Sequence, residues 1–156
     1  MYRNLCTVFA EVANRQPQHL ALVRILNAQN YPLTYGEYLQ RVIHLSAGLE
    51  ATGVSFGDRV LLLSENRPEW AISDYALLSL GAIVVPVYPS LPANQIEYLA
   101  QDSGARVIIV SDEKQYQKAV EVSRKVPQVE TIVVMDPPVE LAGNAISFAD
   151  IERRGA

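Results

Sequence analysis

The sequence predicts an α/β fold, a Rossmann-like layer with a mainly parallel sheet and crossover helices. Four short apolar runs, at 59–64, 83–87, 106–110 and 130–135, alternate with three stretches of helical periodicity, and this alternation is typical of βαβ units. Each run is nearly unbroken rather than alternating with polar residues. We therefore expect strands covered by helices on both faces and joined by right-handed crossovers.

The run Ile83–Val87 is expected to be the central strand of this sheet. It ends in the turn-prone sequence Tyr88-Pro89-Ser90, and a helical pattern begins directly after Pro92. Ligands of open α/β sheets bind outside the carboxyl ends of the strands, so this turn is a candidate ligand-facing wall.

Residues 1–34 are expected to precede the layer as an N-terminal helix and a small hairpin. Apolar residues recur at helical spacing from Leu5, and strands at 20–26 and 31–34 flank a turn at 27–30. The layer itself is assigned to 35–136 and the start of a further segment to 137–156. A helix start this close to the last residue indicates a truncated part of a larger domain.

Several predicted helices begin at residues suited to capping. The N-cap side chain accepts a hydrogen bond from a backbone amide of the first turn. Three pairs have an N-cap residue followed by an acidic residue three positions later: Thr34 with Glu37, Asn66 with Glu69, and Ser147 with Asp150. Asp112 is a further candidate N-cap. We assign Asn66 and Asp112 to capping in preference to ligand contact, and Glu65 with Arg67 to a solvated charge pair.

Composition excludes several classes of function. The net charge of −4 leaves no basic surface for nucleic acid. Cys6 is the only cysteine, so no intramolecular disulfide forms, and no run of about 20 apolar residues could span a bilayer. No signal peptide is visible, because polar residues interrupt the first twenty positions. We expect a cytoplasmic protein without a transmembrane segment.

Familiar catalytic and phosphate-binding motifs are absent. No two of the eight glycines are closer than four residues, which excludes the G-x-G-x-x-G fingerprint and the Walker loop. His19 and His44 lack partners at zinc-ligand spacing. No G-x-S-x-G elbow supports a Ser-His-Asp site, although sequence order alone leaves one open. Trp70 is expected in the core or an interface. No catalytic and no metal-binding residue is assigned.

A series of short motifs, spread over most of the chain, occurs in a fixed order. They are Leu33-Thr34-Tyr35, Gly57-Asp58-Arg59-Val60, Asn66 to Trp70, Gly81-Ala82, Pro89-Ser90-Leu91-Pro92 and Asp102-Ser103-Gly104-Ala105. In this order they resemble the N-terminal portion of the adenylate-forming superfamily, the AMP-binding acyl-CoA synthetases. The segment VPVYPSLPANQIEYLAQDSGA most resembles the long-chain-fatty-acid–CoA ligase branch.

The resemblance implies a parent enzyme that joins fatty acid to CoA through an acyl-adenylate, with ATP and Mg²⁺. The family's phosphate loop, acyl tunnel and catalytic lysine lie further along than this chain reaches. The chain is then an inactive scaffold that binds no cofactor alone, whose partner is the missing remainder of the synthetase. The surface that would contact this missing remainder is then exposed, which favours self-association of the chain. We expect the parent in the cytoplasm, peripheral to the membrane.

The resemblance also marks residues near CoA. In acetyl-CoA-forming relatives the turn matching Tyr88, Pro89 and Ser90 approaches the CoA nucleotide, as does the helix start that matches Lys114 to Lys118. The arginines expected in the second region are missing, and Tyr116 lies in their neighbourhood. Lys114 and Lys118 are the candidate point charges for a phosphate.

Two alternatives stay open. The chain could be a freestanding interaction or regulatory module that pairs with a complete synthetase. A flavodoxin-like or receiver domain is the third possibility. A receiver needs acidic residues at its strand ends, whereas these strands end in Leu63-Ser64, Val87-Tyr88 and Val110-Ser111, which argues against it.

Overall fold

The predicted α/β class is confirmed by a five-stranded sheet in which every pairing is parallel. The computed structural model describes residues 4–141 and 143–156. The strands lie in the order β4-β3-β5-β6-β7. Their bounds are β3 (Arg59–Leu63), β4 (Ile83–Val87), β5 (Val107–Val110), β6 (Thr131–Val134) and β7 (Ala145–Ser147).

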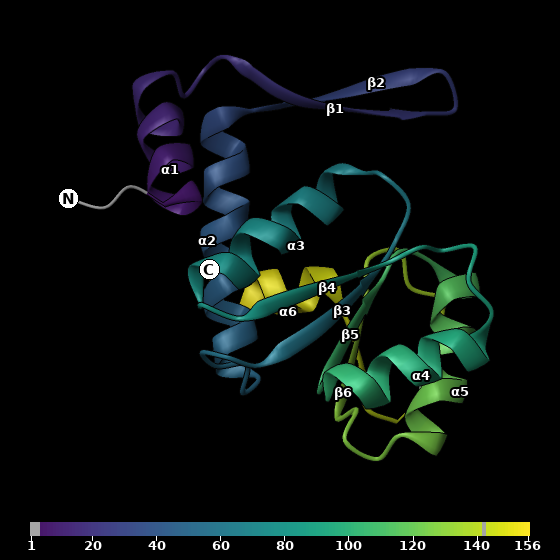
Figure 1. The fold of residues 1–156 in the computed structure, drawn as a ribbon. Helices are drawn as coiled ribbons and strands as arrows, with labels where there is room; N and C mark the ends of the chain where they lie inside the picture. Colours follow the sequence, from purple (N-terminus) through teal and green to yellow (C-terminus); the bar gives the residue numbers. More distant parts are fainter. Residues whose placement is uncertain (1–3, 142) are drawn as a thin grey trace.

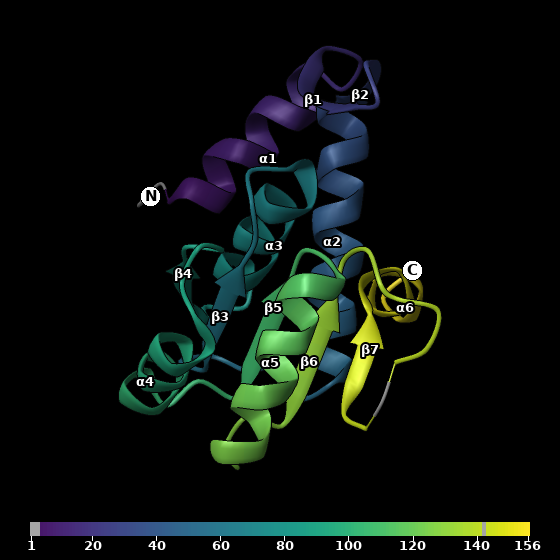
Figure 2. The same cartoon turned by 90° about the vertical axis from the view of Figure 1, so that its right-hand side faces the viewer.

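Helices cover both faces of the sheet (Figures 1 and 2). On one face lie α1 (Leu5–Arg15), α2 (Tyr35–Ala51), α3 (Pro68–Ser79) and α6 (Phe148–Arg154). On the other face lie α4 (Ala93–Ser103) and α5 (Glu113–Lys125). The helices after β3, β4 and β5 are the predicted crossovers.

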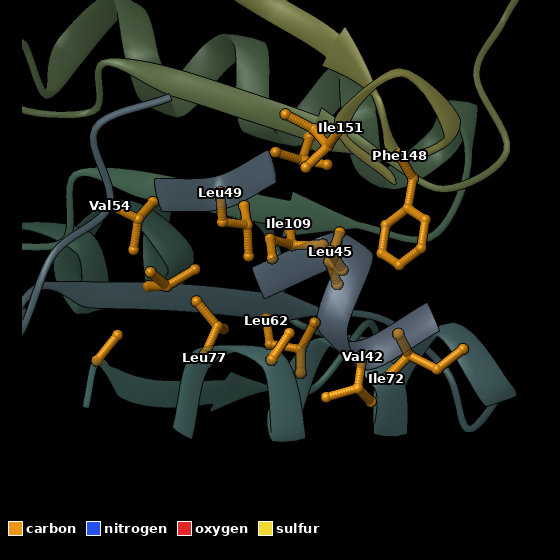
Figure 3. Packing of buried hydrophobic residues seen from close by; sticks show 14 of the residues in the cluster. Val42, Leu45, Leu49, Val54, Leu62, Ile72, Leu77, Ile109, Phe148 and Ile151 are labelled. Atoms are coloured by element: carbon orange, nitrogen blue, oxygen red, sulfur yellow. The ribbon is translucent and has the colours of Figure 1, made fainter. Parts of the chain in front are cut away.

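Strand β3 explains why the apolar runs are unbroken. Val60, Leu61, Leu62 and Leu63 are all fully buried. Val60 and Leu62 pack toward α2 and α3, whereas Leu61 and Leu63 pack toward α4 and α5. Figure 3 shows Leu62 among side chains from α2, α3, β5 and α6. A strand covered on both faces has no polar side to display.

Strand β4 is an edge strand, so its predicted central position is wrong. It pairs with β3 alone, Ile83 is 52% exposed, and Pro86 is exposed as well. The Ile83 amide donates to the Asp58 carbonyl, so in this parallel ladder the backbone of Val84 and Pro86 faces away from β3. A proline is tolerated there because its missing N–H breaks no ladder bond. An apolar run indicates a buried strand but not its place in the order.

The segment after Pro138 contains a strand that the sequence pattern did not reveal. β7 joins the sheet beside β6, with Ile132 opposite Ala145 and Val134 opposite Ser147. It has only three residues, all partly exposed, which is too short for a recognisable periodicity. Residues 137–156 thus supply the last strand of this sheet and helix α6.

The predicted N-terminal helix and hairpin are confirmed. Strands β1 (Leu20–Leu26) and β2 (Gln29–Thr34) form a separate antiparallel pair that projects from the top of the molecule in Figure 1. The turn is tighter than predicted and consists of Asn27 and Ala28, both with positive φ (51° and 60°). Two successive residues with positive φ match the twist of a two-residue hairpin.

Most predicted caps are confirmed, with one exception. The side chains of Thr34, Asp112 and Ser147 each accept a hydrogen bond from a first-turn amide. Asn66 does not cap α3. The N-cap is Arg67, which makes no side-chain cap bond, and Pro68 occupies the first turn. Since proline lacks an N–H, fewer amides at this helix start require a partner.

Helices α2 and α6 approach closely because Gly48 has no side chain. A Cβ at this buried position would overlap the backbone carbonyl of Ile151. Since backbone atoms cannot rotate aside, a larger residue would push α6 away from α2.

Gly48→Ala should therefore destabilise the protein by about 1–3 kcal/mol through overpacking. In an ordinary helix interior the same change stabilises the protein by about 1 kcal/mol. A destabilised Gly48→Ala protein would therefore show that the close contact of α2 with α6 excludes a side chain here. Urea unfolding measures it. Ala47→Gly, at an exposed position of the same helix, is the control and should cost about 1 kcal/mol. A Gly48→Ala protein as stable as the parent would contradict this account of the α2–α6 contact.

Candidate functional site at the carboxyl ends of β3 and β4

An open pocket of about 400 Å³ lies at the carboxyl ends of β3 and β4. It is lined by Ser64, Glu65, Asn66, Trp70, Pro86, Val87, Tyr88 and Pro89. The structure thus brings together two of the predicted ligand-facing strand ends. The third, Ser111-Asp112 after β5, does not line the pocket.

Glu65 is held at this pocket by residues from β5 and α5. Its carboxylate accepts hydrogen bonds from Ser111 Oγ at 2.6 Å and from Gln115 Nε2 at 3.3 Å. Burial acts to raise the pKa of Glu65, but these bonds and the nearby charge of Arg67 outweigh it and hold the pKa below its usual range. The carboxylate is therefore charged near neutral pH.

The predicted charge pair between Glu65 and Arg67 is not formed. Arg67 instead donates from Nε to Glu69 at 2.8 Å, and its Nη1 lies 2.8 Å from Asp136. The same Nη1 donates to the Ser111 carbonyl at 3.2 Å. Within the described residues, Glu65 has no ion pair, because the neighbouring arginine is occupied by two other carboxylates.

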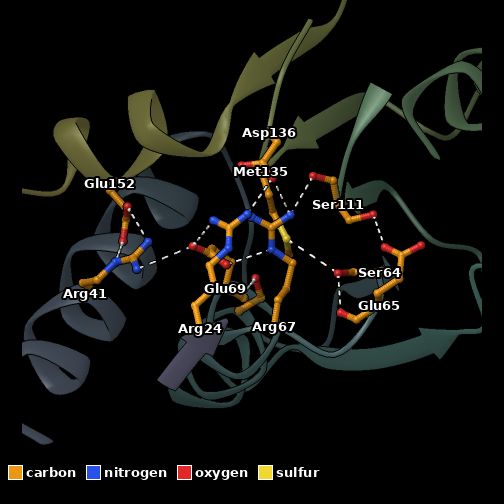
Figure 4. A network of polar contacts seen from close by, with 11 residues as sticks. Arg24, Arg41, Ser64, Glu65, Arg67, Glu69, Ser111, Met135, Asp136 and Glu152 are labelled. Carbon is orange, nitrogen blue, oxygen red and sulfur yellow. Dashed lines mark hydrogen bonds and ion pairs between the residues drawn. The ribbon is translucent and has the colours of Figure 1, made fainter. Parts of the chain in front are cut away.

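Two further arginines extend this network, which Figure 4 shows. Arg24 of β1 lies 3.0 Å from Asp136 and 3.6 Å from Glu69. Arg41 of α2 lies 2.8 Å from Glu152 of α6 and 3.8 Å from Glu69. The network therefore joins the hairpin, α2, α3, α6 and the end of β6. It had no signal in the sequence, since Arg24 and Asp136 are 112 residues apart.

Lys118 is bound to the turn that follows β4. Its ammonium donates to the carbonyls of Pro89 at 2.7 Å and Leu91 at 2.9 Å. It reaches the turn from α5, on the face of the sheet opposite to Trp70 of α3. Two of its three donors are thus used to fix this turn.

The remaining candidates for CoA contact are Ser90 and Lys114. Ser90 is exposed on the turn, and Lys114 is exposed on the first turn of α5. Tyr116 is 3% exposed and packs in the core, so it presents little surface in the region where the family resemblance led us to expect an arginine. The structure brings together Tyr88, Pro89 and Lys118, with Lys114 one turn earlier on α5.

The described residues do not fit the phosphates of ATP or a Mg²⁺ ion. No three His, Cys, Asp or Glu side chains gather as a metal site in the part of the chain that the structure describes. The glycines with positive φ lie in five separate turns, at 53, 57, 81, 104 and 143, so they form no continuous cradle of amides. Among residues 4–141 and 143–156, no helix has the length and hydrophobicity needed to span a bilayer.

The sequence matches the AMP-binding enzyme family over residues 9–153. The chain belongs to this family. A relative in the family is the long-chain-fatty-acid–CoA ligase FadD15 of Mycobacterium bovis (strain ATCC BAA-935 / AF2122/97), 30% identical over 130 residues. That match covers 83% of this chain and 22% of the ligase. The family resemblance predicted from the ordered motifs is confirmed, and the chain spans about a fifth of the length of this relative.

Two further similarities are informative. The uncharacterized protein Rv1549 of Mycobacterium tuberculosis (strain ATCC 25618 / H37Rv) is 35% identical over 136 residues, which cover 86% of this chain and 74% of that protein. The crystal structure of coronafacic acid ligase from Pectobacterium brasiliense superimposes with a TM-score of 0.88 and 23% identity, covering 97% of this chain and 29% of that one. This likeness shows that the chain has the same fold as the matched part of that structure.

Glu69 contacts all three arginines of the network. Removing its charge therefore tests how much the network contributes to stability. Glu69→Gln should destabilise the protein by about 3 kcal/mol, because the side chain is only 12% exposed and its loss leaves Arg67 short of a partner. Urea unfolding at neutral pH measures the change. Glu121→Gln, which removes an exposed pair with Lys125, should have no measurable effect.

The difference in stability between the parent protein and Glu69→Gln should depend on pH. Burial acts to raise the pKa of Glu69, but the hydrogen bond from Arg67 and the charges of Arg67 and Arg24 hold it below its ordinary value of 4.5. The contribution of the ionised carboxylate is therefore complete above about pH 4.5 and is lost as the pH falls through the lower folded pKa. A stability gap between parent and Glu69→Gln that stayed constant on acidification would show that the charge is not what matters.

Proposed function

We propose that the chain is the N-terminal part of an AMP-forming long-chain-fatty-acid–CoA ligase. The observation that supports it is the 30% identity to the FadD15 ligase over 83% of the chain. In the parent reaction the fatty acid carboxylate attacks the α-phosphate of ATP and releases pyrophosphate. The CoA thiol then attacks the acyl-adenylate, forms the thioester and releases AMP.

In this proposal the chain acts as scaffold, and the phosphate chemistry belongs to the missing remainder of the synthetase. The scattered glycines and the lack of an acidic cluster among the described residues support this division. ATP, Mg²⁺, CoA and fatty acid are then ligands of the parent. We place that parent in the cytoplasm, peripheral to the membrane.

We also propose Tyr88, Pro89, Ser90, Lys114 and Lys118 as the CoA-side residues of the parent. Lys118 fixes the turn, because its ammonium is bound to the Pro89 and Leu91 carbonyls. Lys114 is exposed and is the charge better placed to meet a phosphate.

The isolated chain should release no pyrophosphate when incubated with fatty acid, ATP and Mg²⁺, because residues 4–141 and 143–156 contain neither a phosphate cradle nor a metal-ligand set. A coupled pyrophosphate assay checks this, with the complete mycobacterial ligase as positive control. Fatty-acid-dependent release by the isolated chain would overturn the scaffold assignment.

In an intact ligase that carries this segment, Lys114→Glu should raise the KM for CoA several-fold and leave adenylate formation unchanged, since that step uses no CoA. An unchanged KM would remove Lys114 from the CoA side.

A second candidate is a freestanding interaction module that pairs with a complete synthetase. It is favoured by Rv1549, 74% of whose length is covered by the match. Mixing the purified chain with a complete ligase distinguishes the two. A module should co-elute with the ligase in gel filtration and alter its rate, whereas a part of a synthetase should do neither.

The isolated chain should also self-associate. Val84 presents unpaired backbone groups on the edge of β4, and α3 carries the half-buried Trp70 beside it. Light scattering over a concentration series should show a mass above that of the 17.3 kDa monomer. A monomer at every concentration would contradict this, and Val84→Pro, which removes an outward N–H, should weaken the association.

A further inference from the structure

The pocket at the carboxyl ends of β3 and β4 contains a carboxylate that forms no ion pair. Glu65 lines the pocket and makes no ion pair within the described residues. The nearby carboxylates of Glu69 and Asp136 differ in this respect, since arginines bind both (Figure 4). A charged Glu65 therefore leaves a net negative charge at this pocket.

Buried neighbours hold this carboxylate in place. Ser111 and Gln115, which donate to its two oxygens, are each 1% exposed. A carboxylate has about four acceptor sites, so Glu65 keeps acceptor capacity beside these two bonds and the one from its own backbone amide. A guanidinium can use this capacity, because all five of its N–H groups are donors.

The pocket has two aromatic side chains and two prolines in its lining. Trp70 comes from α3 and is half-buried, Tyr88 is 79% exposed at the rim, and Pro86 and Pro89 are further apolar members of the lining. Aromatic faces attract cations, and a planar guanidinium can stack on a ring while it pairs with a carboxylate. A volume of about 400 Å³ leaves space for an aliphatic stem behind such a group.

We propose that this pocket is a binding site for a guanidinium group, which pairs with Glu65 and stacks against Trp70 and Tyr88. The site goes beyond the proposed ligase reaction, whose substrates and products are anions. It is also separate from the lysine side of the turn, because Lys118 contacts Pro89 and Leu91 from the opposite face of the sheet. The guanidinium is supplied either by an arginine side chain of a polypeptide or by a free small molecule.

Trp70 is the only tryptophan in the chain, so its fluorescence reports on this pocket directly. Titration with argininamide should give a saturable change. Citrullinamide, which has a neutral urea group of nearly the same shape, should bind at least about tenfold more weakly, because it lacks the charge. Equal responses to the two compounds, or no saturable response to argininamide, would overturn the proposal.

Variants test the residues. Glu65→Gln should weaken argininamide binding at least about tenfold, whereas Glu113→Gln, an equal change of charge at an exposed site on α5, should leave it unchanged. Tyr88→Ala removes a side chain that is 79% exposed, so folding should persist while binding weakens several-fold. Far-UV circular dichroism confirms that each variant is folded. Undiminished binding by a folded Glu65→Gln protein would exclude the site.

A blocked Gly-Arg-Gly peptide distinguishes the two sources. Binding about tenfold tighter than that of argininamide assigns the site to an arginine of a polypeptide, because neighbouring backbone adds contacts. Equal affinity assigns it to a free guanidinium compound. Both outcomes support a guanidinium site, whereas failure of the peptide and the amide alike would exclude it. A chain without ligase activity in the pyrophosphate assay leaves this test unaffected.

Discussion

The residues Val60 to Leu63 of β3 have no exposed surface, and they stay buried only while a helical layer covers each face of the sheet. Burying each leucine contributes roughly 1.5–3 kcal/mol, so a missing layer would expose more apolar surface than a small domain can tolerate. This constraint requires crossover helices on both sides. It also requires α2 and α6 to pack tightly over the first face, where Gly48 allows their backbones to meet.

The order of the strands determines where the pocket lies. From β3 the chain leads to β4 on one side and then returns to β5 on the other, so the strand order reverses between β3 and β5. A crevice at such a reversal is the usual ligand site of an open α/β sheet. Here the bond from Ser111 to Glu65 spans it, and Gln115 packs behind. The open space lies instead between the ends of β3 and β4, with Glu65 on its wall.

Much of the fold was predictable because local chemistry determines it. The unbroken apolar runs, the caps at Thr34 and Asp112, and the hairpin were all identified from the sequence. The position of β4 was not, since the same valines serve a central or an edge strand when helices cover most of both faces. Strand β7 was missed because three residues carry no periodicity.

The candidate site was predictable only in part. Strand ends pointed to Tyr88 and Pro89, and the structure places both at the pocket. The partners of Glu65 could not be identified, because Ser111 and Gln115 meet it through the folding of β5 beside β3. Arg67, two residues after Glu65, suggested a pair, but Glu69 and the distant Asp136 bind that arginine instead. Sequence separation alone could not identify the partner, since Glu69 lies as close to Arg67 in the sequence as Glu65 does.

Pro86 has a consequence for how the protein behaves in a crowded solution. A long free edge lets one chain add to the next without limit, as in a growing fibril. On the outward side of β4, Pro86 offers an acceptor but no donor, so a strand docked there finds its hydrogen-bond ladder broken after Val84. The edge therefore resists open-ended addition of further strands.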